Sequence, residues 1–401
     1  MQSKRFHSSL LCGVLIAMPL HAATIRQAFE LATALDAPLL AAQQSKADLA
    51  LHNAQALTPE PLTLAISGKS SLEQRDAPSF GAREYEAELG IPLWQWGQKE
   101  RLYTQLKASA DFDQQQLLHQ RWQLAGELRE AVWTARLAQH DAQLASSKVA
   151  ALQKLADDAA RRLKSGDIAP LDFNLAQNAL LQVRLGEQQA QQSAVDAERQ
   201  FQALLGDHQL ALPDEDEVVS ADLSAAHHPQ LQQLSAQQAL ARAQLIQAQS
   251  DTRAAPELAV TLTRERGSQT ELYQHLGKLA IKIPFGSDGR TQVQIASANS
   301  ELIAVQTAMQ RTQQLVAAQQ ATSLQAMQHS ERALALFEQR QKLAAESWQW
   351  QQRSYKAGQI GLAAFLNAQI DYLDSEFATQ RARLELGRTR SRYLQVMGVL
   401  P

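Results

Sequence analysis

The sequence predicts an α+β chain built from two tandem repeats, and three observations carry this prediction. Residues 162–168 read Arg-Leu-Lys-Ser-Gly-Asp-Ile, and residues 354–360, 192 positions later, read Ser-Tyr-Lys-Ala-Gly-Gln-Ile. Before each of these motifs lies a stretch of about 68 residues with almost no glycine or proline. Before each stretch, a short segment alternates apolar and polar residues with period two. A repeat of this length indicates a duplicated half-domain rather than a solenoid unit.

The N-terminus has the pattern of a secretory signal peptide over residues 1–22. Lys4 and Arg5 precede an apolar run over residues 10–20, and small residues follow it. We expect cleavage after Ala22 or Ala23. The apolar run is too short for a membrane-spanning helix, and no later segment is long and apolar enough for one. We therefore expect an exported protein without a transmembrane helix.

The composition argues against catalysis and against nucleic-acid binding. The only cysteine, Cys12, lies inside the signal peptide, so we expect neither a disulfide nor a thiolate site in the mature chain. The balance of 38 basic and 41 acidic residues gives no support for nucleic-acid binding. His227 and His228 form the only histidine cluster, and we expect them in a solvated loop rather than in a metal site. We predict no enzyme, no cofactor and no metal.

The two uninterrupted stretches predict two very long helices. Residues 98–165 and 290–357 are rich in Ala, Gln, Leu, Glu and Arg, which are strong helix formers. At 1.5 Å per residue each helix would be roughly 100 Å long, and a helix of this length must pack against others. Apolar residues step by three and four along both, as in coiled coils. These residues are Leu124, Leu128, Ala131 and Ala135 in the first stretch and Leu302, Val305, Met309 and Val316 in the second.

Each long helix is expected to end at its glycine and to turn back into a second helix. Gly166 and Gly358 supply the left-handed conformation that closes a helix, and Pro170 suits the start of the next one. The predicted helical hairpins cover about 98–205 and 290–397. Further helices are predicted at 38–56 and 229–253, and residues 206–228 form the linker. The repeats are therefore 23–205 and 229–401.

The alternating segments predict two β-hairpins, at about 61–93 and 256–285. In the first, Leu62, Leu64 and Ile66 share one face; in the second, Leu279, Ile281 and Ile283 do so. The strands have the length of membrane-spanning β-strands, with one apolar and one polar face. Four strands cannot close a barrel, and an open sheet edge cannot lie in lipid. If the strands span a membrane, other protomers must complete the barrel.

These features together resemble the TolC family of outer-membrane efflux channels. The resemblance covers essentially the whole mature chain, and it is carried by the two glycine motifs, each followed by Phe-x-x-Ala-Gln, at 173–177 and 365–369. It implies a homotrimer in the outer membrane of a Gram-negative bacterium. Three chains would share one 12-stranded β-barrel in outer-membrane lipid, and their helices would form a periplasmic α-helical coiled-coil barrel. The lower end of this tunnel would meet a periplasmic adaptor protein and an inner-membrane pump of the proton-driven resistance-nodulation-division type.

Within the family, the amino-acid sequences of the two motifs are most similar to those of the branch that works with heavy-metal pumps of the cobalt-zinc-cadmium type. The resemblance thus implies a passive exit duct for heavy-metal cations. A channel for drugs or for type I protein secretion is the alternative. A structural periplasmic coiled-coil protein is an alternative of another class. An adaptor is disfavoured, because adaptors carry one helical hairpin flanked by lipoyl-like β halves, whereas this chain has two hairpins.

The tips of the two hairpins are the predicted adaptor-binding site. Small residues allow close approach of another helical hairpin, and exposed apolar residues add contact area. The alternative is that the two glycines only close their helices. The candidate residues are Leu163, Ser165, Gly166, Ile168 and Ala169 in the first tip and Lys356, Ala357, Gly358, Ile360 and Leu362 in the second.

The resemblance also implies an aperture that polar contacts between tip helices hold closed. Asp172 and Tyr355 match one such pair, and Asn367 and Asp371 are further candidates for the aperture. This chain departs from the family pattern at Ile360, where a basic residue is expected, and Asn367 replaces an acidic one. We expect at least one of two tryptophans before the second tip, at positions 348 and 350, to pack between helices.

Overall fold

The structure is a computed structural model that describes residues 24–34, 36–72, 78–206, 208–214, 217, 228–250, 252–286 and 289–401. The expected signal peptide and most of the linker lie outside these residues. The elements are α1 (Ile25–Ala34), α2 (Ala37–Ala54), β1 (Thr63–Ser70), β2 (Arg83–Pro92), α3 (Gln98–Ser165), α4 (Pro170–Leu204), α5 (Pro229–Ser250), β3 (Glu257–Arg266), β4 (Gln274–Lys282), α6 (Gly289–Lys356) and α7 (Leu362–Val396).

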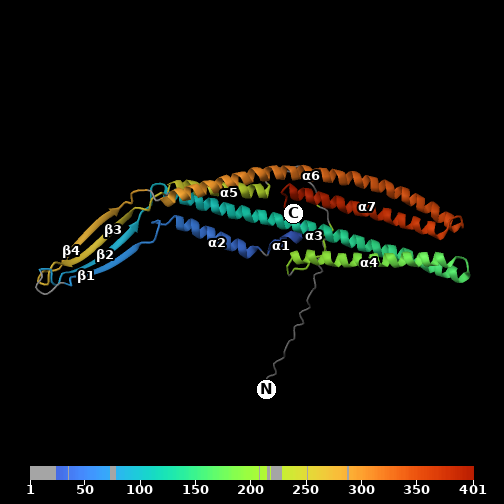
Figure 1. The fold of residues 1–401 in the computed structure, drawn as a ribbon, viewed down its shortest axis with the longest axis horizontal. Coiled ribbons are helices and arrows are strands. Elements are labelled where there is room, and N and C mark those ends of the chain that lie inside the picture. Colours follow the sequence, from blue (N-terminus) through green and yellow to red (C-terminus); the bar gives the residue numbers. More distant parts are fainter. Residues whose placement is uncertain are drawn as a thin grey trace, which may run out of the picture.

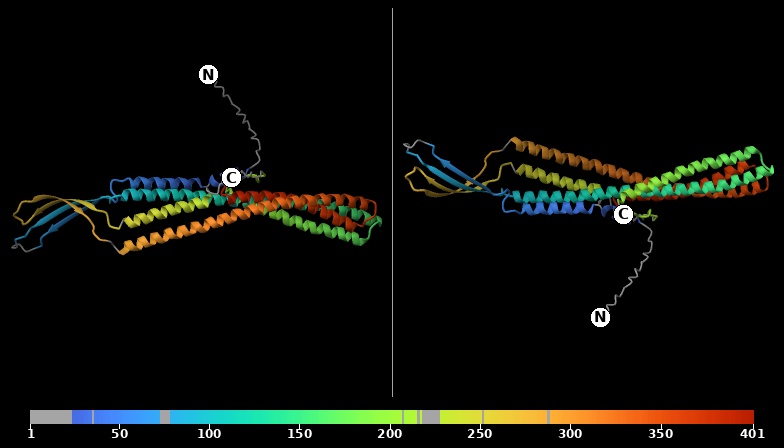
Figure 2. Two further views of the ribbon diagram at one scale, coloured as in Figure 1. Left: turned by 90° about the horizontal axis from the view of Figure 1, so that it is seen from above. Right: turned by 90° about the horizontal axis from the view of Figure 1, so that it is seen from below.

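The molecule is a long rod with the four strands at one end and the two helical tips at the other (Figure 1). The long helices α3 and α6 each contain 68 residues, and the return helices α4 and α7 each contain 35. The C-terminus lies near the middle of the rod, where α5 approaches the end of α7 (Figure 2). The prediction of two equivalent helical hairpins is confirmed.

The helices form one layer in which α3 is central. Towards the tips, α3 packs between α4 and α7, and α6 packs on the far side of α7. Towards the strands, α3 packs between α2 and α5, and α6 packs on α5. Because the layer is one helix thick, the core is a chain of seams between neighbouring helices. Leu128, Val132 and Trp133 of α3 are almost completely buried in these seams.

The strands form a single antiparallel sheet in the order β1-β2-β3-β4, in which β2 and β3 join the two repeats. Residues that pair across the four strands form rows, and successive rows alternate between apolar and polar side chains, as the sequence predicts. Leu64, Leu89, Val260 and Leu279 form one row, and the next row is Ala65, Glu88, Thr261 and Lys278. We call the first side the apolar face and the second the polar face. The polar face carries the ion pair between Glu88 and Lys282.

The helix α1 was not among the predicted elements. A reciprocal pair of hydrogen bonds closes its start: the Gln27 N–H donates to Thr24 Oγ1 at 3.1 Å, and the Thr24 N–H donates to Gln27 Oε1 at 3.2 Å. This Thr-x-x-Gln capping box was the sequence signal that could have revealed the helix. Ile25 and Ala28 pack against the middle of α3 and the end of α4, where Phe201 is fully buried.

The fold class is confirmed: two tandem repeats combine long α-helical coiled coils with two β-hairpins. The short helices end slightly earlier than expected, at Ala54 and Ser250. In the part of the chain that the structure describes, no helix has the length and apolar character needed to cross a membrane.

Candidate functional site

The two hairpin tips close through the same backbone motif. Gly166 and Gly358 have φ values of 80° and 72°. In the first tip, the Asp167 N–H donates to Arg162 O at 2.8 Å and the Gly166 N–H donates to Leu163 O at 3.1 Å. In the second, residues 359 and 358 donate to residues 354 and 355 at 2.9 and 3.0 Å. Both turns are Schellman motifs, so glycine closes each helix as predicted.

One shared core supports both tips. Leu152, Leu155 and Ala156 of α3 pack with Ala176 and Leu180 of α4 and with two residues at the start of α7, Leu362 and Phe365. The Phe365 ring stacks on Tyr355 at 4.2 Å and lies 5.0 Å from Trp348, measured between ring centroids. The prediction that one of the two tryptophans packs between helices is therefore confirmed for Trp348, whereas Trp350 is 66% exposed.

Most of the predicted contact residues lie on the surface of the tips. Leu163, Ile168 and Ile360 are half-buried, and Ile168 and Ile360 pack on the tip core. The exposed residues are Ser165, Gly166, Ala169, Lys356, Ala357 and Gly358. A Cβ added at either glycine would meet no atom within 4 Å, so the surface beside each turn is open.

The expectation that Leu362 lies exposed on the tip is wrong. Its side chain is only 8% exposed and belongs to the shared core, because the first residue of α7 points towards α3 and α4. The residue at the same position of the first repeat is Pro170, and Leu171 and Leu175 after it are exposed by 69% and 43%. Sequence reasoning missed these two leucines. Their spacing of four on one helix face was the signal that could have found them.

The predicted aperture residues Asp172 and Tyr355 interact electrostatically within the chain. Burial raises the pKa of the Tyr355 hydroxyl above its ordinary value of 10.0; Arg162 opposes this increase, and the carboxylates of Asp158 and Asp172 reinforce it. The Arg162 guanidinium lies 5.2 Å above the Tyr355 ring and 2.9 Å from Asp158. Residues of α3 and α6 thus meet beside the turns, and the charge of Asp172 on α4 acts on the same tyrosine.

The two further aperture candidates lie on the exposed side of α7. Asn367 is exposed, and Asp371 forms an ion pair with Arg340 of α6 at 3.4 Å. The next acidic residue, Asp374, pairs instead with Lys148 of α3. Both carboxylates are therefore neutralised by neighbouring helices within the chain.

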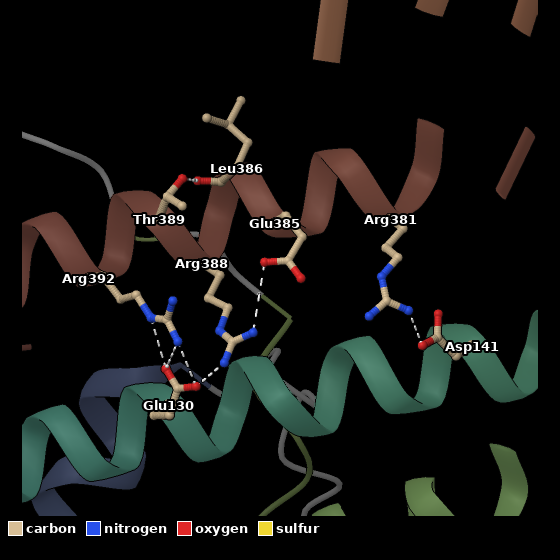
Figure 3. A network of polar contacts seen from close by, with 8 residues as sticks. All are labelled: Glu130, Asp141, Arg381, Glu385, Leu386, Arg388, Thr389 and Arg392. Atoms are coloured by element: carbon tan, nitrogen blue, oxygen red, sulfur yellow. Dashed lines mark hydrogen bonds and ion pairs between the residues drawn. The ribbon is translucent and has the colours of Figure 1, made fainter. Parts of the chain in front are cut away.

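A ladder of ion pairs continues this contact between α3 and α7 along the rod (Figure 3). Arg381 pairs with Asp141, and both Arg388 and Arg392 donate to Glu130. Burial opposes ionisation of Glu130, but the hydrogen bonds from these two arginines outweigh it and lower the pKa of the carboxyl. The charges on α7 therefore hold the second repeat against the first.

The middle of the rod contains a buried charge that the sequence did not reveal. Arg129 of α3 is 2% exposed, and its guanidinium contacts Glu217 of the linker at 2.7 Å. The same guanidinium donates to Gln395 Oε1 and to Val399 O at the end of the chain. This contact fastens the linker and the C-terminus to the first repeat.

The expectation of a solvated loop at His228 is wrong, and His227 lies outside the described residues. The His228 side chain is 1% exposed and meets the Trp122 ring edge to face at 4.9 Å. Burial, together with His119, lowers the pKa of His228. In the part of the chain that the structure describes, no group of three or more His, Cys, Asp or Glu side chains could hold a metal ion.

Residues 24–207 match the family model described as "Outer membrane efflux protein". The first repeat therefore matches the model of outer membrane efflux proteins over almost its full length. The second repeat follows the same order of elements with long helices of the same length, so the architecture extends through the chain. Proteins of this family are channels, which agrees with the prediction that the chain is not an enzyme.

Solved structures with the same fold cover almost the entire chain. The outer membrane protein VceC from Vibrio cholerae superposes with a TM-score of 0.76 at 14% identity, over 94% of this chain and 96% of VceC. The CmeC outer membrane channel from Campylobacter jejuni gives a TM-score of 0.73 at 12% identity, over 93% and 85%. CusC gives 0.75 at 14% identity, over 94% and 92%, and its structures concern transmembrane channel formation. No curated protein matches the chain in sequence.

Proposed function

We propose that the protein is the outer-membrane channel of a tripartite efflux system, a passive exit duct that works as a homotrimer. The sheet lies in the outer membrane and the helices extend into the periplasm. One observation carries the proposal: a sheet with one apolar and one polar face occupies one end of a rod, and two Schellman-closed tips occupy the other. The helices α3 and α6 separate the two ends by roughly 100 Å.

The tips dock a periplasmic adaptor, which connects the channel to an inner-membrane pump of the resistance-nodulation-division type. The open space beside Gly166 and Gly358 suits a partner helix that approaches the backbone closely. The exposed Leu171 and Leu175 add apolar area next to the first turn. The two tips differ here, because the buried Leu362 follows the second turn, so a trimer presents two kinds of tip in alternation.

The test replaces the tip glycines with leucine. Gly166→Leu and Gly358→Leu should leave trimers in the outer membrane but abolish efflux, because the new side chain fills the docking surface. Gly286→Leu is the matched control: Gly286 also has a positive φ, 97°, and open space around it, but it lies next to the sheet. Efflux is measured as the tolerance of a deletion strain that carries each variant to toxic metals and drugs. Full tolerance with both tip variants would contradict adaptor docking at the tips.

We further propose that the cargo is heavy-metal cations. The support is the similarity of the tip sequences Lys-Ser-Gly-Asp-Ile-Ala and Lys-Ala-Gly-Gln-Ile-Gly to the heavy-metal branch of the family. The cations pass through the duct as substrate, with the pump supplying the energy. A deletion strain should lose tolerance to zinc, cobalt, cadmium or copper. If tolerance to all four metals is unchanged while tolerance to drugs falls, the metal cargo is wrong and the exit duct stands.

A further inference from the structure

The apolar face of the sheet changes abruptly in character near the ends of the strands farthest from the helices. Three successive rows on this face are apolar, from Ile91 and Leu258 to Ala87 and Leu262. The next two rows are not. The first contains Tyr85, Arg264 and His275, and the second contains Arg83 and Arg266.

Three arginines and two tyrosines thus gather on the side of the sheet that would contact lipid. The guanidinium of Arg264 lies 4.4 Å from the centroid of the Tyr273 ring, and that of Arg266 lies 5.0 Å from it. These contacts hold two cations on one ring. Arg266 also donates to Gly81 O at 3.0 Å, which anchors it to the neighbouring hairpin turn. Arg83, Tyr85 and Arg264 remain exposed.

A hollow of about 410 Å³ lies where the apolar rows meet this basic row. Ile66, Ala87 and Leu262 line its apolar part, and Arg264 and His275 line the other part. Gly277 also lines the hollow, and a Cβ added there would meet no atom within 4 Å. An apolar floor below a cationic rim has the chemistry of a lipid site, in which acyl chains contact the floor and a phosphate contacts the rim.

We propose that this surface binds a phosphorylated glycolipid of the outer leaflet, the lipid A portion of lipopolysaccharide. This inference rests on the outer-membrane placement in the proposed function, because the strand ends far from the periplasmic helices then lie at the outer leaflet. Arginine binds phosphate through two parallel hydrogen bonds and suits this role better than lysine. Arg83, Arg264 and Arg266 lie on neighbouring strands, so they match a headgroup with more than one phosphate rather than a single-phosphate lipid.

Charge on the opposite face supplies a matched control. Lys69 lies in the polar-face row between the rows that contain Arg83 and Arg264, and Lys278 lies in another polar-face row, paired with Thr261. Arg83→Gln with Arg264→Gln and Lys69→Gln with Lys278→Gln each remove two positive charges from the same sheet. Arg266 is left in place because its contact with Gly81 supports the turn.

The experiment measures lipid binding to purified trimers in nanodiscs. Three probes are used: bisphosphorylated lipid A, dephosphorylated lipid A and phosphatidylglycerol. The wild type and the lysine variant should bind bisphosphorylated lipid A most tightly. The arginine variant should bind it at least about tenfold more weakly, since each charged hydrogen bond is worth roughly a factor of ten in affinity.

A second variant tests the hollow without changing any charge. Gly277→Leu fills the space that the acyl chain would occupy, and we expect weaker binding of bisphosphorylated lipid A to trimers that remain heat-modifiable. Equal binding of all three probes, or equal losses in the arginine and lysine variants, would overturn the lipid site. Trimers absent from the outer membrane in every variant and in the wild type would instead contradict the proposed function.

Discussion

The long helices α3 and α6 have the same length and the same place in their repeats, yet their surroundings differ completely. α3 lies between neighbours along its entire length and buries Leu128, Trp133 and even the charged Arg129. Of the α6 side chains that the structure describes, only Thr291, Val305 and Val316 are buried. Duplication therefore produced two equivalent helices, and their position in the layer made one the core and the other an edge.

The edge helix carries a second apolar seam that has no partner within the chain. Leu315, Leu336, Leu343 and Trp350 lie at multiples of seven residues from one another and are all more than 60% exposed. Such a heptad stripe is the seam of a coiled coil. In the proposed trimer it faces the neighbouring protomer, where α2 and α4 form the opposite edge of the layer.

The largest expected effect is the loss of trimers when this stripe receives a charge. Leu315→Asp would place an unpaired carboxylate in three equivalent interfaces, at several kcal/mol each. Gln313→Asp, two residues earlier on another face of α6, adds the same charge and should leave trimers intact. Native gel migration in detergent measures the outcome. If both variants form trimers equally well, the stripe is not the interface.

The next effect compares a buried charge of α3 with an exposed charge beside α6. Arg129→Met leaves Glu217 without its ion-pair partner, and we expect a loss of about 3 kcal/mol in the free energy of unfolding. Arg390 pairs with Glu331 of α6 at 3.3 Å on the surface, and Arg390→Met should cost less than about 1 kcal/mol. Denaturation in detergent gives both values. Equal losses would mean that burial does not distinguish the two pairs.

Two glycines within the return helices α4 and α7 also allow a buried site to be compared with an exposed one. A Cβ at Gly387 would lie 2.1 Å from the Trp133 ring of α3, whereas a Cβ at Gly186 would meet no atom within 4 Å. Gly387→Ala should therefore destabilise by about 1–3 kcal/mol through overpacking. Gly186→Ala should stabilise by about 1 kcal/mol, because alanine is the better helix former. Thermal unfolding of the two variants should shift in opposite directions.

The smallest effect is a pH dependence at the middle of the rod. Because the folded state lowers the pKa of His228, it favours the neutral imidazole. The resulting stability is complete above the ordinary histidine value of about 6.5 and is lost as pH falls through the lowered folded value. The melting temperature should fall on acidification below about pH 6.5. His228→Gln should reduce this decrease, and an unchanged slope would exclude His228 as its origin.

The sequence alone determined the duplicated architecture, because helix length, glycine closure and strand alternation are local properties. The bounds of α3 and α7, the Schellman turns and the two faces of the sheet all follow from residues close together in the chain. The heptad stripe of α6 is likewise visible in the sequence once the helix is known. Of the tip candidates, Gly166 and Gly358 could be placed on the surface in this way.

Tertiary structure alone decided which of the equivalent residues are buried. Leu362 enters the shared tip core, while Pro170 at the same position of the first repeat remains exposed, because α7 packs between α3 and α6 and α4 lies at the edge. Arg129 meets Glu217, and Trp122 meets His228, only after α3 comes together with the linker and the start of α5. These pairings depend on contacts between segments about a hundred residues apart. No local pattern specifies such contacts, because burial is a property of the complete layer.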